Sequence, residues 1–166
     1  MSRRVVITGL GTVNPLGNNV HDFWEGVKEN RLGISKVEQF DTDSIGISVA
    51  GQVKDFEPTD FIDKKEAKRM ERFTQFAVVA SDEAIKDSGT DFKDIDPYRA
   101  GVIIGCGIGG IGLTLSEYEK FLNKGPNRVS PFYVPMMIGN MAAGQVSMKT
   151  GFKGDNFSTV TACASG

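Results

Sequence analysis

Short apolar runs and helix-spaced apolar positions follow one another along the chain. Residues 5–8 (VVIT) and 100–104 (AGVII) are apolar runs next to glycines, as is typical of strands inside a parallel sheet. The β-branched residues 159–161 favour an extended strand that leads to Cys163. Because predicted strands alternate with predicted helices, the pattern indicates an α/β fold with at least three strands.

Four segments place apolar side chains at helical spacing. Positions 20, 23, 24 and 27 predict a helix that docks on an apolar surface, with Asn18 or Asn19 as its N-cap. Residues 66–86 give the strongest pattern, with an alanine-rich face that lets a neighbouring element approach closely and a stop at Ser88 and Gly89. Residues 113–122 and 136–149 predict two further helices, the second ended by Thr150 and Gly151.

Two segments lack this helical spacing. Residues 31–64 carry many turn formers and read as an excursion from the core, with a half-exposed strand or hairpin arm near residues 45–49. Residues 130–135 (SPFYVP) hold two prolines four apart, which predicts a rigid extended ribbon that cannot be helical. The four methionines of residues 136–148 suit an adaptable core or a wall against a fatty ligand.

Composition narrows the possible roles. The 166 residues fit one domain, and 19 basic against 21 acidic residues create no field that favours nucleic acid or an anionic membrane. The start of the chain predicts neither a signal peptide nor a membrane span. Two cysteines without metal spacing suggest a reducing, cytoplasmic setting, and we expect no metal and no cofactor. His21, the single histidine, is predicted to be a surface residue.

Cys163 lies among very small residues (TACASG, 161–166). Small neighbours leave the sulfur uncrowded and let the backbone turn sharply, as a nucleophile on a strand-to-helix turn requires. Without further information, a small buried cysteine in a tight turn is the alternative, because free cysteine often behaves as a small hydrophobe.

Residues 105–110 (GCGIGG) follow a predicted strand and precede a predicted helix, as a dinucleotide-binding loop would. The acidic residue expected about twenty positions later is absent, since residues 126–131 read PNRVSP. The loop could instead line a cavity, with Ile108 as its one large side chain.

Taken together, residues 5–11, 105–110, 130–135, 140–144 and 161–166 resemble the β-ketoacyl-[acyl-carrier-protein] synthases of bacterial fatty-acid synthesis, most closely the type II elongating members. The resemblance covers residues 1–166 in order and implies a thiolase-like fold, layered α-β-α-β-α in the complete enzyme. This chain would be the N-terminal portion, which ends at the nucleophile turn. By the same resemblance, two histidines, a lysine and a phenylalanine gate would lie beyond Gly166, so the chain alone is expected to be inactive.

The resemblance also implies an activity and a site. Cys163 would accept an acyl chain from acyl carrier protein, and malonyl carrier protein would then lose carbon dioxide and extend that chain by two carbons. Ile108 would form the floor of the acyl pocket, and a homodimer is expected. The implied substrate-binding residues are Gly107, Ile108, Tyr133, Val134, Met137 and Ala162. Cys106 and His21 gain no role.

Two positions depart from the family pattern. Tyr133 stands where phenylalanine is common, and Thr159 stands where an apolar residue is common.

Other functions stay open. A non-catalytic, synthase-like partner subunit is one alternative, although such subunits lack the nucleophile. A nucleotide-binding domain that uses residues 105–110 is a second, and a module of a polyketide synthase is a third.

Overall fold

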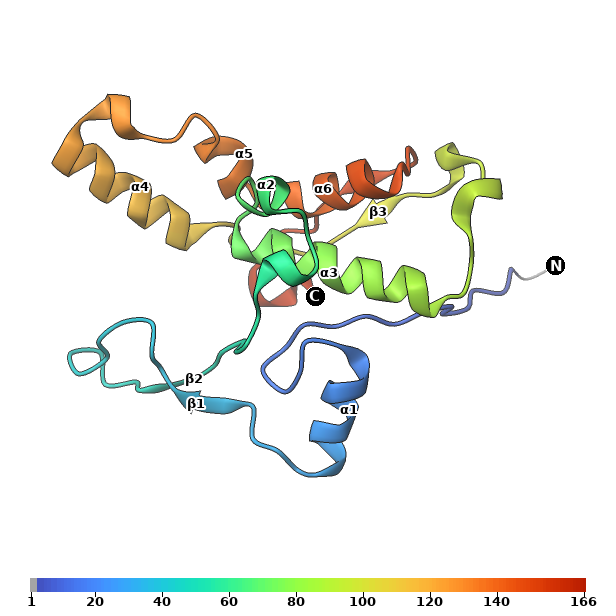
Figure 1. The fold of residues 1–166 in the computed structure, drawn as a ribbon, viewed down its shortest axis with the longest axis horizontal. Helices are drawn as coiled ribbons and strands as arrows, with labels where there is room; N and C mark the ends of the chain where they lie inside the picture. Colours follow the sequence, from blue (N-terminus) through green and yellow to red (C-terminus); the bar gives the residue numbers. More distant parts are fainter. Residues whose placement is uncertain (1–2) are drawn as a thin grey trace. The chain divides into compact units, whose positions relative to one another are not determined.

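The computed structural model describes residues 3–166, which divide into two compact units. The first unit comprises the described residues up to Glu57 together with Val79–Thr90, and the second comprises Pro58–Val78 and Asp91–Gly166. Helix α3 (Arg72–Asp87) contributes residues to both units. Figure 1 labels the main elements of each.

In the first unit, α1 (Val20–Lys28) begins where the sequence predicts it. Asn19 is the N-cap, because its side chain accepts a hydrogen bond from the backbone N–H of Asp22. The predicted docking on an apolar surface is confirmed only in part, since Val20 and Phe23 are half-buried but Trp24 is 57% exposed and Val27 is also exposed. The buried residue of this helix is Gly26 instead.

The hairpin of the first unit lies within the predicted excursion. Strands β1 (Ile34–Lys36) and β2 (Val49–Gly51) pair antiparallel, with Ser35 opposite Ala50. Strand β2 therefore begins at residue 49, where the predicted strand was expected to end. Ile45 lies instead in a turn, which its N–H closes by donating to the Thr42 carbonyl.

The strand predicted at residues 5–8 is wrong. Among residues 3–166 this segment pairs with no strand, and Val5 and Ile7 are 95% and 83% exposed. Without a partner for its backbone groups, an apolar run of this kind cannot form a sheet. Two acidic side chains of α3 hold the residues that follow, since the N–H groups of Leu10 and Thr12 donate to Asp87 and Glu83, respectively.

The close approach predicted for the alanine-rich face of α3 is confirmed. A Cβ built on Gly11 would lie 1.9 Å from the carbonyl oxygen of Ala80, and one built on Gly9 would lie 2.1 Å from that of Ala84. Only glycine fits at this distance, so the backbone itself packs on the helix.

The helix predicted over residues 66–86 is interrupted. In the second unit, η1 (Pro58–Asp60) precedes α2 (Lys64–Ala67), and α3 starts only at Arg72. The Gln75 amide donates to the carbonyls of Ala67 and Met70, and the Glu71 carboxylate accepts from the N–H of Phe73. These side chains pair with backbone groups that the break leaves without a partner in either helix.

A short parallel sheet organises the second unit. Strand β3 (Val102–Ile103) pairs with β4 (Asn156–Phe157), and backbone hydrogen bonds extend the pairing as far as Cys106 and Thr159. Helix α6 (Met141–Thr150) packs on both strands and buries Ala142, Ala143 and Val146. The sequence predicted that this strand is buried on both faces of the sheet. That prediction is wrong for Ile103, which is 60% exposed.

Helix α4 (Ile111–Lys124) confirms the prediction over residues 113–122 and leads through η4 (Pro126–Arg128) to α5 (Tyr133–Met137), as Figure 1 shows. The extended ribbon predicted at 130–135 is therefore wrong, because residues 131–132 form a turn and the following residues begin α5. Pro135 fits because it lies in the first turn, where a backbone N–H has no acceptor within the helix. The helix predicted at 136–149 is divided between α5 and α6. Short 3₁₀ turns complete the unit: η2 (Phe92–Asp94), η3 (Pro97–Arg99) and η5 (Ala162–Ser165).

Candidate active site

Cys163 lies in η5, which follows β4 of the parallel sheet after a connection of residues 158–161. Its side chain is exposed, so the interpretation as a buried structural cysteine is wrong. The preceding residue, Ala162, has a φ of +52°, a left-handed conformation that costs energy for a residue with a side chain. The N–H of Cys163 makes no hydrogen bond to any residue from 3 to 166. The turn therefore presents both the thiol and an open backbone donor.

Two hydroxyl groups close the turn around Cys163. Ser165 Oγ donates to the carbonyl of Ala162 (2.7 Å) and accepts from the N–H of Thr161 (2.8 Å). Thr159 Oγ1 donates to the carbonyl of Ser165 (3.0 Å). Hydrogen bonds to the backbone before and after Cys163 thus fix the turn, and the Cys163 side chain stays exposed.

The glycine loop packs directly on this turn. A Cβ on Gly105 would lie 1.7 Å from the Ser165 carbonyl oxygen, and one on Gly107 would lie 3.0 Å from that of Ala162. The N–H of Cys106 donates to Thr159 and does not point to open space. Because the N–H groups of Cys106 and Gly110 already donate to backbone carbonyls, they are not free to bind a pyrophosphate, and the structure argues against the dinucleotide-binding interpretation.

The residues predicted to bind substrate come together only in part. Gly107 packs against the turn that contains Ala162 and Cys163, and Ile108 follows Gly107 with 71% of its surface exposed. Met137 reaches the same loop through its carbonyl, which accepts from the N–H of Gly110 (2.8 Å). The role of Ile108 as a pocket floor remains a prediction.

Tyr133 lies at a second place, in an apolar cavity of about 380 Å³ beside α4. Its hydroxyl donates to Thr114 Oγ1 (3.3 Å), which in turn donates to the carbonyl of Gly110 (3.0 Å). Val134 does not line this cavity and is 57% exposed. The lining residues are Thr114, Leu115, Glu117, Tyr118, Phe121, Val129 and Tyr133.

Glu117 is a buried carboxylate that the sequence did not single out. It is 3% exposed, and it contacts Lys120 Nζ (2.5 Å) and accepts from the N–H of Ser130 (2.7 Å). Lys120 and the Ser130 amide lower the pKa of Glu117, because both favour the charged form more than burial opposes it. Its i,i+3 spacing from Lys120 was the available sequence signal, but such pairs are common on exposed helix faces.

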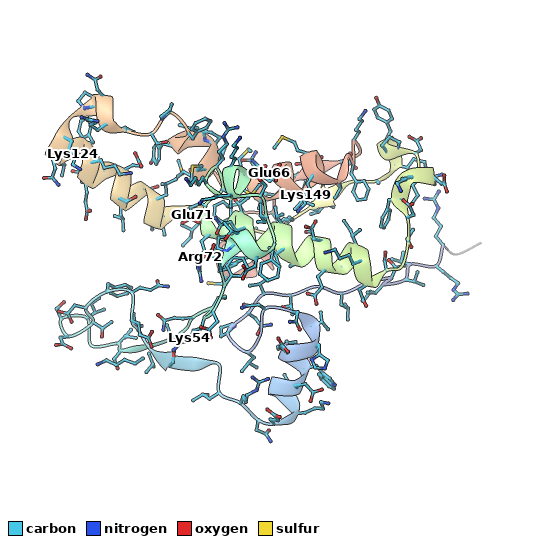
Figure 2. All side chains as sticks on the ribbon, in the orientation of Figure 1. Lys54, Glu66, Glu71, Arg72, Lys124 and Lys149 are labelled. Atoms are coloured by element: carbon cyan, nitrogen blue, oxygen red, sulfur yellow. The ribbon has the colours of Figure 1, made fainter. Side chains whose placement is uncertain are left out.

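Other polar groups lie outside the turn and the α4 cavity. Glu66 of α2 and Lys149 of α6 line a cavity of about 340 Å³, and Figure 2 labels both side chains. His21 is exposed next to Asp22, whose pKa is lowered by hydrogen bonds from Asn19 and His21.

In the described part of the chain, no three His, Cys, Asp or Glu side chains form a metal-binding group, and no helix is long and apolar enough to cross a bilayer.

A family model described as the N-terminal domain of β-ketoacyl synthase matches residues 2–166. The chain therefore belongs to the β-ketoacyl synthase family. It is 50% identical over 165 residues to 3-oxoacyl-[acyl-carrier-protein] synthase 2 of Staphylococcus aureus strain N315, and 48% identical over 164 residues to the protein of the same name from Synechocystis. These alignments cover 99% of the chain, which spans only about 40% of the length of each relative.

Solved structures agree with this assignment. The ishigamide ketosynthase/chain length factor matches 97% of this chain and 40% of its own with a TM-score of 0.81 and 26% identity. A β-ketoacyl synthase from Burkholderia phymatum STM815 matches 99% of this chain and 41% of its own with a TM-score of 0.77 and 26% identity. The predicted α/β, thiolase-like fold is confirmed, and this chain corresponds to its N-terminal part.

Proposed function

We propose that the chain is the nucleophile-bearing part of a 3-oxoacyl-[acyl-carrier-protein] synthase of fatty-acid biosynthesis, an acyltransferase. The observation that carries the proposal is an exposed Cys163 after a left-handed residue, on a turn with an open backbone N–H. The names of relatives about half identical to the chain support the same reaction.

In the first step, the Cys163 thiolate attacks the thioester carbonyl of an acyl chain carried by acyl carrier protein. The new carbon–sulfur bond forms as the carbon–sulfur bond to the carrier breaks and the carrier's thiolate leaves, so one thioester replaces another. The open N–H of Cys163 supplies a hydrogen-bond donor for the oxyanion of the tetrahedral intermediate. A sulfur leaving group suits both the formation and the later release of the acyl chain.

In the second step, malonyl carrier protein loses carbon dioxide and its carbanion attacks the acyl-Cys163 thioester. The Cys163 thiolate leaves, and the product is a 3-ketoacyl carrier protein that is two carbons longer. Acyl carrier protein is thus the proposed partner in both steps, and a homodimer in the cytoplasm is part of the same proposal. Groups outside residues 1–166 would complete this step.

The test is acylation of the full-length gene product with acyl carrier protein that carries a radiolabelled C10 to C16 chain. We expect label on the parent protein and on a Cys106→Ala control, and none on Cys163→Ala. Cys106 is the matched control because it is the other cysteine of the chain and lies between Gly105 and Gly107, the two glycines that pack on the nucleophile turn. Label that persists on Cys163→Ala would show that the nucleophile is elsewhere.

A further inference from the structure

Thr159 stands at the junction between the glycine loop and the nucleophile turn. Its backbone carbonyl accepts from the N–H of Cys106 (3.0 Å), and its hydroxyl donates to the carbonyl of Ser165 (3.0 Å). A Cβ on Gly105 would lie 3.1 Å from Thr159 Oγ1, so the hydroxyl faces the loop at close range. One residue therefore holds both segments that meet at Cys163.

From these contacts we propose that the Thr159 hydroxyl is a positioning group for Cys163. The inference rests on the proposed function, because it concerns the orientation of the same thiol. Thr159 fixes the backbone of Ser165, and Ser165 Oγ then bridges the N–H of Thr161 and the carbonyl of Ala162. The two hydroxyls form a relay that ends on the residues that flank Cys163.

The left-handed backbone of Ala162 explains why the turn needs such a relay. An alanine at a φ of +52° relaxes toward a negative φ unless surrounding contacts hold it. That relaxation would rotate the peptide between Ala162 and Cys163 and would move both the thiol and its N–H. An apolar residue at position 159 cannot donate to Ser165, so this chain uses a contact that depends on its own threonine.

The neighbouring hydroxyl of Ser158 has a different role. Ser158 Oγ donates to the carbonyl of Ile104 (2.5 Å) and so joins the two strands of the sheet. It has no hydrogen bond to the residues of η5 within the described chain. The relay to the cysteine therefore depends on Thr159.

The experiment measures the rate constant and the KM for acylation of Cys163 in the full-length gene product. Thr159→Val removes the hydroxyl at constant shape, and Thr159→Ser keeps it. Thr90→Val is the matched control, because the Thr90 hydroxyl also donates to a backbone carbonyl, that of Ser88 (3.3 Å), outside the site. Peptide mass spectrometry after iodoacetamide treatment measures the reactivity of Cys163 without any acyl substrate.

We expect Thr159→Val to lower the acylation rate constant about threefold to tenfold, the worth of one hydrogen bond, with KM unchanged and with a thermal midpoint lowered no more than in Thr90→Val. Thr159→Ser should stay within about twofold of the parent, as should Thr90→Val. In a Ser165→Ala background, Thr159→Val should have little further effect, because the relay is already broken. A Thr159→Val protein that acylates and alkylates Cys163 at the parental rate would overturn the inference.

Failure of the proposed function gives a different result. If the parent protein is not acylated, the proposed reaction is wrong, whereas the alkylation rates still test the position of the thiol. Equal loss of rate and of thermal midpoint in Thr159→Val and Thr159→Ser would assign Thr159 a purely structural role and would also overturn the inference.

Discussion

The nucleophile turn and the α4 cavity are both in the second unit, but they are built in different ways. The turn is held by close backbone packing and by two short hydroxyl side chains, since Gly105 packs on the Ser165 carbonyl where any Cβ would clash, and Thr159 and Ser165 hydrogen-bond to backbone groups of the turn. The cavity is held by side chains, since Tyr133 hydrogen-bonds to Thr114 and Glu117 is held by Lys120. Substitutions should therefore act differently at the two places.

The difference matters for the proposed chemistry. A nucleophile must keep one position within a fraction of an ångström, which backbone contacts provide. An apolar cavity can adapt its shape to a ligand through side chains that change rotamer. We infer that the turn tolerates substitution less well than the cavity does.

Gly105→Ala should have the largest effect. The new Cβ would lie 1.7 Å from the Ser165 carbonyl oxygen, so the loop and the turn must separate. We expect a loss of about 3 kcal/mol in the free energy of unfolding, at the upper end for an overpacked site. Urea denaturation of the full-length gene product, with acylation of Cys163 as a second measurement, checks this.

Gly112→Ala is the control for the same chemical change. A Cβ there would be 3.9 Å from Glu71 Oε1, and the residue is the second of α4. Because Gly112 lies in the first turn of the helix, alanine there should raise the free energy of unfolding by no more than about 0.5 kcal/mol. If the two variants lose stability equally, the close packing of loop and turn is wrong.

Glu117→Gln should change the pH dependence of stability. The folded pKa of Glu117 lies below its ordinary value of 4.5, so the carboxylate stabilises the fold above that pH and the contribution is lost as pH falls through the folded pKa. The parent should therefore be more stable than Glu117→Gln at pH 7, and the difference should shrink below pH 4.5. Thermal midpoints from pH 7 down to pH 3 measure this.

Glu119→Gln is the matched control on the same helix. Glu119 is exposed, and the described chain gives it no ion pair, so the substitution should leave the pH profile of the parent unchanged. A Glu117→Gln protein with the same pH profile as the parent would contradict the role given to the buried carboxylate.

The sequence predicted local features better than long-range contacts. Capping by Asn19 and the stop at Gly151, which has a φ of +75°, depend on neighbours along the chain and are confirmed. The run at residues 5–8 and the run at 100–104 look alike in sequence, but only the second has a partner strand, near Phe157, in the described structure. Pairing depends on distant residues, so an apolar run alone could not distinguish the two.

In the candidate site, too, local features were predicted and long-range contacts were not. The small residues around Cys163 indicated an uncrowded thiol, which is confirmed by its exposure. The relay through Thr159 and Ser165 could not be predicted, because it depends on the backbone conformation of Ala162. Likewise, nothing in the spacing of Tyr133 and Thr114, nineteen positions apart, indicated their hydrogen bond.

Tyr133→Phe should have the smallest effect. The hydrogen bond to Thr114 Oγ1 is 3.3 Å long and partly buried, so its loss should lower the free energy of unfolding by about 0.5 kcal/mol. Tyr118→Phe is the control, because Tyr118 lines the same cavity and its hydroxyl makes no hydrogen bond within residues 3–166. Urea denaturation should separate the two variants, and a Thr114→Val background should abolish the difference. Equal stability of the two phenylalanine variants would show that the cavity keeps Tyr133 in place by packing alone.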